Sequence, residues 1–153
     1  MTITESQNKI EKVVELQAPV SRVWQAITNH EEFGQWFHVR LDNPFEEGRT
    51  TTGQITYPGH EDMKWVSITE RLDHEKLFVF SWPPGDADPD NEYDDAAKVT
   101  VEFRFEPTDT GTRLTITESG FLQFPEAKRL EILRSNTEGW NIQAENIRSY
   151  VTG

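Results

Sequence analysis

The chain contains no cysteine, and its basic residues are few. Without cysteine there can be no disulfide framework, no thiolate metal site and no cysteine nucleophile. Asp and Glu number 27 against 15 Lys and Arg, which gives a formal net charge of −12. Nucleic acids and anionic membranes recruit basic residues, so this sign of charge disfavours both as partners. No apolar run approaches the roughly 20 residues of a membrane-spanning helix. We therefore expect no nucleic-acid partner and no membrane insertion.

The motifs of several enzyme classes are also missing. The sequence has no HExxH, GxSxG, GxGxxG or GxxxxGKS/T pattern. These are signatures of zinc hydrolases, serine hydrolases, dinucleotide sites and phosphate-binding loops. The four histidines fall in expected turns or at expected helix ends, and none forms a metal-ligand pair: His30, His38, His60 and His74. We expect neither a metal ion nor a cofactor.

The length predicts a single domain over residues 1–153. A chain of this size buries roughly 68–70% of its unfolded surface, which is enough for a core without covalent cross-links. Residues 1–8 are polar and lack the basic start and apolar run of a signal peptide. We expect this first segment to be disordered or frayed, and the protein to be cytoplasmic and monomeric.

Aromatic residues, in contrast, are plentiful. The chain has five Trp and nine Phe, although it is otherwise polar. Large aromatic side chains need an extensive apolar environment. Phe78, Phe80 and Trp82 alternate along one face of an expected strand, and Trp140 lies on the apolar stripe of an expected helix. This many large aromatic side chains predict a cavity lined by aromatic residues in addition to a core.

Hydrophobic periodicity predicts an α+β fold. Alternation of apolar and polar residues indicates six strands, at 9–17, 51–57, 64–72, 75–82, 98–106 and 112–119. Helical spacing, with Pro19 and Pro125 at first turns, indicates three helices, at 19–28, at 31–37 and from Pro125 to about Val151. Strands in hairpin succession form an antiparallel sheet, and the long last helix is the expected cover for its apolar face.

Four segments resemble those of a known superfamily, in the same order along the chain. They are APVSRVWQAIT (18–28), EEFGQWF (31–37), GTRLTITESGF (111–121) and GWNIQAENIRSYV (139–151). In these segments the chain resembles the Bet v 1/START-like (SRPBCC) superfamily, and within it the C-terminal domain of the activator of Hsp90 ATPase.

The resemblance implies a helix-grip fold, in which a curved antiparallel sheet of about six strands surrounds a long C-terminal helix and two short helices follow the first strand. Members of the superfamily bind sterols, lipids, polyketides and plant hormones in the cavity between sheet and helix, and some are polyketide cyclases. Fold alone does not fix activity, so the resemblance indicates a site more directly than a reaction.

Glu118 is the most informative polar residue. It continues the apolar face of Leu114 and Ile116 along the strand at 112–119. Two interpretations remain open. Either Glu118 points into the cavity, where burial would raise its pKa and suit it to orient a ligand or transfer a proton, or the strand ends there and the carboxylate is solvated.

The segment PPGDADPDNEYDD (83–95) is an acidic loop. Asp86, Asp88 and Asp90 have the alternate spacing of a calcium loop, but Asn91 replaces the required glycine and Ala97 replaces the final glutamate. We interpret the segment as a solvated loop, and a lid over the cavity mouth is a further hypothesis.

Three functions are compatible with this sequence. The first is binding of a small hydrophobic, aromatic or polycyclic molecule. The second is a cyclase- or hydratase-like enzyme with Glu118 as general acid or base. The third is a weak contact with an Hsp90-type chaperone, which the short segment before the first strand disfavours. Binding is the first hypothesis, and the predicted cavity lining is Trp36, Trp65, Phe80, Trp82, Glu118, Phe121, Trp140 and Gln143.

Overall fold

The computed structural model describes residues 8–86, 88, 92–94 and 96–152. Within them, seven strands form one antiparallel sheet in the order β1-β7-β6-β5-β4-β3-β2. The strands are β1 (Lys9–Leu16), β2 (Val39–Leu41), β3 (Thr50–Ile55), β4 (Lys64–Asp73), β5 (Leu77–Trp82), β6 (Val99–Pro107) and β7 (Thr112–Ser119). The helices are α2 (Val20–Thr28), α3 (His30–Phe37) and α4 (Glu126–Thr152), with short 3-10 turns η1 (Pro84–Asp86) and η2 (Phe121–Gln123).

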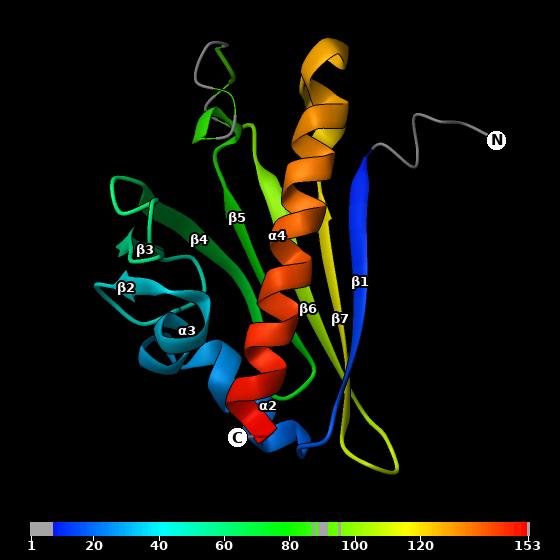
Figure 1. Cartoon of the computed structure of the whole chain (residues 1–153). Helices are drawn as coiled ribbons and strands as arrows, with labels where there is room; N and C mark the ends of the chain where they lie inside the picture. Colours follow the sequence, from blue (N-terminus) through cyan, green and yellow to red (C-terminus); the bar gives the residue numbers. More distant parts are fainter. Residues whose placement is uncertain (1–7, 87, 89–91, 95, 153) are drawn as a thin grey trace, which may run out of the picture.

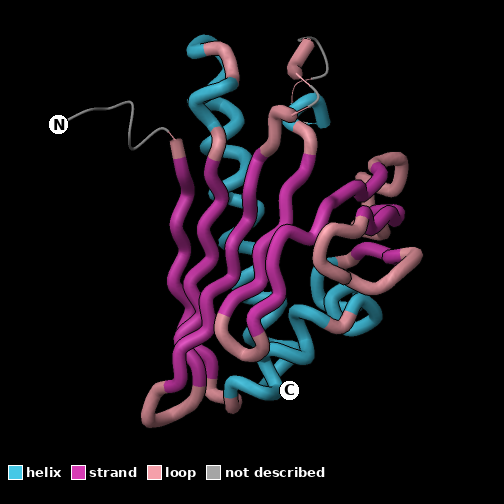
Figure 2. Tube along the Cα trace, turned by 180° about the vertical axis from the view of Figure 1, so that it is seen from behind, coloured by secondary structure: helices cyan, strands magenta, loops and turns pink. Residues whose placement is uncertain are grey.

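The sheet curves around α4, which lies across its concave face (Figure 1). Seen from behind, the strands lie in front of α4, and the three helices occupy the same side of the sheet (Figure 2). The buried side chains of α4 recur at helical spacing and face the sheet: Trp140, Ala144, Ile147 and Val151. The predicted helix-grip α+β fold is therefore confirmed.

Strand β2 is the element that periodicity does not indicate. It has only three residues, Val39–Leu41, and pairs antiparallel with β3 at the edge of the sheet. A three-residue strand is too short to show alternation, so the prediction of about six strands missed it. The predicted strand at 75–82 also begins too early. Glu75 adopts the left-handed conformation, with φ of 59°, and β5 starts at Leu77.

Helices α2 and α3 meet at a sharp corner. Asn29 lies between them, and its side-chain oxygen accepts hydrogen bonds from the backbone N–H groups of Glu31 and Glu32, at 3.1 and 3.0 Å. This N-cap satisfies two of the free donors at the start of α3. Trp36 then donates from Nε1 to the backbone oxygen of Ala26 at 2.8 Å, which fixes α3 against α2.

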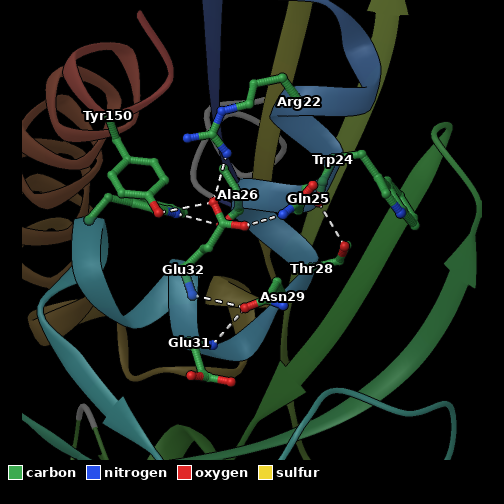
Figure 3. Close-up of polar contacts among 10 residues, drawn as sticks. Arg22, Trp24, Gln25, Ala26, Thr28, Asn29, Glu31, Glu32 and Tyr150 are labelled. Atoms are coloured by element: carbon green, nitrogen blue, oxygen red, sulfur yellow. Dashed lines mark hydrogen bonds and ion pairs between the residues drawn. The ribbon is translucent and has the colours of Figure 1, made fainter. Parts of the chain in front are cut away.

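A polar cluster joins these two helices to the end of α4 (Figure 3). Glu32 Oε1 accepts hydrogen bonds from Arg22 Nη1 at 2.6 Å and from the Tyr150 hydroxyl at 2.9 Å. Glu32 Oε2 accepts another from Gln25 Nε2 at 2.6 Å. Burial acts to raise the pKa of Glu32, but these donors outweigh it and the pKa is lowered. The cluster thus connects α2, α3 and α4 at one end of the grip.

Strand register determines where Glu118 points. In β7, Glu118 is opposite Ile10 of β1 and Val101 of β6. Leu114 and Ile116 are buried on the same face. Successive side chains of a strand alternate between faces, so Glu118 continues this line toward α4. Of the two interpretations left open by the sequence, the structure supports the inward one.

Candidate functional site

A cavity of about 580 Å³ lies between α4 and the strands β3 to β7. Its aromatic lining comes from five residues, Phe37, Trp65, Phe80, Trp82 and Trp140. Smaller apolar side chains fill the remaining wall, among them Ile55, Val101 and Ile132. The charged residues of the lining are Glu118 in the interior, and Lys64 and Glu131, which are both exposed. The cavity is thus an aromatic hollow with one internal carboxylate.

Six of the eight predicted lining residues surround this cavity, namely Trp65, Phe80, Trp82, Glu118, Trp140 and Gln143. Trp36 and Phe121 lie elsewhere, both buried in the core. Trp36 is turned toward α2 by its hydrogen bond to Ala26, and Phe121 sits in η2, where its ring lies 6.0 Å from that of Phe124. Apolar character identified these two residues as buried, but it could not distinguish core from cavity wall.

Phe37 and Asn136, which are outside the eight predicted lining residues, also line the cavity. Phe37 follows Trp36 directly, and the last turn of α3 presents it, instead of Trp36, to the hollow. Asn136 precedes Trp140 by four residues on α4. Residues four apart share a helix face. The position of Asn136 four residues before Trp140, which points inward, could therefore have identified it as a lining residue.

Glu118 is held by donors from α4. The side chain is buried, with 2% of the residue surface exposed. Its Oε1 accepts one hydrogen bond from Trp140 Nε1 at 2.9 Å and another from Asn136 Nδ2 at 3.2 Å. Oε2 accepts no hydrogen bond from the residues that the structure describes. One carboxylate oxygen is therefore engaged by the protein, and the other remains for a ligand.

Burial raises the pKa of Glu118 to about 7. Desolvation disfavours the charged form, and the donor groups of Trp140, Asn136 and Trp82 lower the pKa by less than burial raises it. Trp82 Nε1 is itself buried and meets no acceptor at hydrogen-bonding geometry within the described chain. Trp82 therefore lowers the pKa of Glu118 without a hydrogen bond of normal geometry, and by less than Trp140 and Asn136 do.

The polar groups of two other lining residues are already engaged. Gln143 Nε2 donates to the backbone oxygen of Phe37 at 3.2 Å, and Gln143 Oε1 accepts from Asn146 at 3.1 Å. Trp65 donates from Nε1 to the Ser67 hydroxyl at 2.9 Å. These residues therefore present mainly apolar surface to the cavity, which leaves Glu118 as its internal polar feature.

The acidic loop is described only in part. Asp90 and Asn91, on which the calcium-loop comparison rested, lie outside the described residues, as do residues 87, 89 and 95 of the hypothetical lid. Asp88 is buried, forms an ion pair with Lys128 of α4 at 2.8 Å and accepts a hydrogen bond from the Tyr93 hydroxyl at 2.8 Å. The described residues contain no group of His, Asp and Glu able to hold a metal ion, and no described helix could cross a membrane.

Solved structures with similar folds come from several bacteria. A protein from Arthrobacter aurescens has a TM-score of 0.75 at 16% identity, with 99% of this chain and 90% of that chain covered. Protein BH1534 from Bacillus halodurans has a TM-score of 0.70 at 22% identity, with 94% and 96% covered. DynU16, described as a putative protein in the dynemicin biosynthetic locus, has a TM-score of 0.73 at 18% identity, with 95% and 47% covered. Identities this low show the fold alone.

Comparison with curated proteins gave no match. A family does match almost the whole sequence, over residues 17–152, and it is described as "Activator of Hsp90 ATPase homolog 1-like protein". The sheet, the gripped helix and the cavity between them agree with that match. The chain belongs to the activator of Hsp90 ATPase homolog 1-like family, within the Bet v 1/START-like superfamily.

Proposed function

We propose that this protein binds a small hydrophobic molecule with aromatic or polycyclic character in the cavity between the sheet and α4. The observation that carries the proposal is a cavity of about 580 Å³ with five aromatic residues and a single interior carboxylate in its lining. Cavities of roughly 300–1,000 Å³ with apolar walls and a few convergent polar groups are typical of small-molecule sites.

The walls and the carboxylate have separate roles in this proposal. Trp65, Phe80 and Trp82 offer broad ring surfaces, whose burial against a ligand supplies most of the affinity. Glu118 Oε2 supplies a fixed point to which one polar group of the ligand is oriented. The fold of DynU16, whose description places it in a biosynthetic locus, supports a small organic molecule as the occupant.

A ligand screen by amide and indole chemical shifts tests the proposal. Ring compounds of different sizes, sterols and fatty acids are added to the ¹⁵N-labelled protein. We expect saturable shifts at the indole N–H groups of Trp65, Trp82 and Trp140. An absence of shifts with every compound, or shifts confined to the outer face of the sheet, would contradict a cavity ligand.

A matched pair of variants on α4 locates the site. Ile132 lines the cavity and is half-buried, whereas Ile142 lies on the same helix, outside the lining, and is exposed. We expect Ile132→Trp to fill part of the cavity and weaken binding, and Ile142→Trp to leave binding unchanged. Equal effects of the two substitutions would place the ligand elsewhere.

A cyclase- or hydratase-like activity is the second candidate. The observation in its favour is the pKa of Glu118 of about 7, close to the value that suits a general acid or base at neutral pH. Exchange of an acidic C–H of a bound ketone with deuterated solvent, followed by NMR, tests this function. We expect exchange that depends on pH near 7 and falls by roughly 10²-fold or more in Glu118→Gln. Binding of the ketone without any exchange would contradict this activity and would support a binding protein.

The remaining expectations concern organisation and partners. We propose that the protein is cytoplasmic and monomeric, and that residues 1–153 form one domain. The family description makes a weak chaperone contact the competing role. Light scattering measures the oligomeric state, and a pull-down against an Hsp90-type chaperone with and without a cavity ligand measures the contact. A contact that persists in Ile132→Trp would show a surface role independent of the cavity.

A further inference from the structure

The immediate side-chain neighbours of the Glu118 carboxylate are donors. Trp140 Nε1 and Asn136 Nδ2 donate to Oε1, and Trp82 Nε1 lies near enough to lower the pKa of the group. An indole N–H is a donor that cannot accept. The residues opposite Glu118 on the two adjacent strands, Ile10 and Val101, have apolar side chains. These donors favour the ionised carboxylate, although by less than burial disfavours it.

The carboxylate nevertheless has no positive partner in the described part of the chain. No charged group is among the causes that shift the pKa of Glu118. Lys64, the one cationic residue of the described lining, is exposed, as is the second acidic residue, Glu131. A buried ion without a counter-charge is strongly destabilised. The cavity thus holds an anionic group that no described residue neutralises.

The aromatic residues of the cavity are suited to binding a cation. Trp140 directs the N–H edge of its indole ring to the carboxylate, so the cation–π contribution is expected from the other aromatic lining residues, Trp65, Phe80 and Phe37. The faces of aromatic rings attract cations, and this attraction increases when the cation is removed from water. The net charge of −12 also favours the approach of a cation over that of an anion.

We propose that the ligand of this cavity is a lipophilic cation, a ring compound whose protonated amine pairs with Oε2 of Glu118 while its rings occupy the aromatic walls. The inference rests on the proposed ligand-binding function and adds the chemical class of the ligand. A neutral ring compound leaves the buried carboxylate unpaired, and an anionic one is repelled by it. The carboxylate therefore selects among ligands of similar shape by their charge.

Four fluorescent probes of nearly constant shape test the selection: 1-(aminomethyl)pyrene, 1-pyrenemethanol, 1-methylpyrene and 1-pyreneacetate. They differ in carrying a cation, a hydroxyl, a methyl group or an anion. We expect the amine to bind wild-type protein at pH 8 about 10-fold or more tightly than the methyl compound, because a charge-assisted hydrogen bond and cation–π contacts are added. The anion is expected to bind most weakly.

Two variants separate the contribution of Glu118 from that of Glu131 at the edge of the cavity. Glu118→Gln keeps the shape of the side chain and removes its charge, and we expect it to bring the affinities of amine and methyl compound to within about 2- to 3-fold. Glu131→Gln removes a carboxylate that is exposed at the edge of the same cavity. The preference for the amine is expected to survive in Glu131→Gln.

The pH dependence of wild-type binding gives a test that needs no variant. None of the four histidines lines the cavity, so Glu118 is the group of the described lining expected to titrate between pH 6 and pH 8. The apparent affinity scales with the fraction of protein in the binding-competent state. The amine is therefore expected to bind about 10-fold more tightly at pH 8 than at pH 6, whereas the affinity of 1-methylpyrene stays constant.

The possible results are distinguishable. A preference for the amine that is lost in Glu118→Gln and grows with pH supports the inference. Equal affinities for amine and methyl compound, or tighter binding of the hydroxyl compound, overturn the inference and leave the ligand-binding function in place. If none of the four probes binds, both the inference and the proposed function are overturned for ring compounds of this size.

Discussion

The indole nitrogen of Trp140 lies 2.9 Å from Oε1 of Glu118 and joins the centre of α4 to the end of β7. The two residues are 22 positions apart in the chain and are both buried. The hydrogen bond crosses the space between the gripped helix and the sheet, so it is at once a structural tie and part of the cavity lining.

Replacing Trp140 with phenylalanine keeps an aromatic ring and removes the indole donor. We expect the pKa of Glu118 to rise above its value of about 7, because the hydrogen bond from Trp140 is the largest of the contributions that lower it. The ¹³C chemical shift of the Glu118 side-chain carboxyl, followed against pH, measures the change. Trp24→Phe is the control, since Trp24 packs against Phe105 and His74, away from Glu118. An unchanged pKa in Trp140→Phe would show that the bond is absent in solution.

Glu118 should make the protein less stable as the pH rises. Its pKa is about 7 in the folded state against 4.5 for an ordinary glutamate, so between these values the folded state holds a proton that the unfolded state has lost. Stability contributed by this difference is complete below pH 4.5 and is lost as the pH rises through 7. The expected loss between pH 5 and pH 8 is about 2–3 kcal/mol, from 1.36 kcal/mol per pKa unit.

Urea unfolding of wild-type protein and of Glu118→Gln at pH 5 and pH 8 measures this loss. Other groups titrate in both proteins, so the difference between the two pH dependences isolates Glu118. We expect the stability of Glu118→Gln relative to wild type to increase by about 2–3 kcal/mol from pH 5 to pH 8. Parallel pH profiles would contradict a raised pKa.

Tyr150→Phe removes one donor from the polar cluster around Glu32. The hydroxyl donates to Glu32 Oε1 at 2.9 Å and is the contribution of α4 to that cluster. We expect a loss of roughly 1–2 kcal/mol in the free energy of unfolding, as for a hydrogen bond to a charged group. Tyr57→Phe is the matched control, because no hydrogen bond of the Tyr57 hydroxyl is present among the described residues. Equal losses in the two variants would indicate that the cluster contributes no stability.

Two helical glycines should respond in opposite ways to alanine. A Cβ atom at Gly139 of α4 would meet nothing within 4 Å, whereas at Gly34 of α3 it would lie 2.3 Å from the backbone oxygen of Val39. We expect Gly139→Ala to stabilise the protein by roughly 0.5–1 kcal/mol, because alanine has the higher helix propensity. Gly34→Ala should destabilise it by about 1–3 kcal/mol through steric overlap. Thermal unfolding measures both, and stabilisation by Gly34→Ala would contradict the close approach of α3 to β2.

Much of the fold was predictable because each element shows its buried face in its own periodicity. The alternation of Val99, Val101, Phe103 and Phe105 predicted a one-sided strand, and all four are buried. The spacing of Trp140, Ala144 and Ile147 likewise predicted the face of α4 that meets the sheet. Strand β2 was not predictable, because three residues carry no period and its pairing depends on β3.

The candidate site was predictable only in part. Periodicity placed Phe80 and Trp82 on one face of their strand, and the structure has both in the cavity wall. It gave Trp36 and Phe121 the same apolar character, but contacts with Ala26 and Phe124 hold them in the core. A side chain that points inward does not necessarily line the cavity, because that depends on whether the neighbouring elements leave space beside it.

By itself, the sequence determined the order of the longer elements, the buried faces of the strand at 98–106 and of the last helix, and the position of Glu118 in line with Leu114 and Ile116. Only the tertiary structure decided that this line ends under α4, where Trp140 and Asn136 donate to the carboxylate and no cationic side chain among the described residues pairs with it. The physical reason is the range of the interactions. Side-chain periodicity is a local property of one strand or helix, whereas burial, pKa and cavity volume arise from the distances between elements that are far apart in the chain.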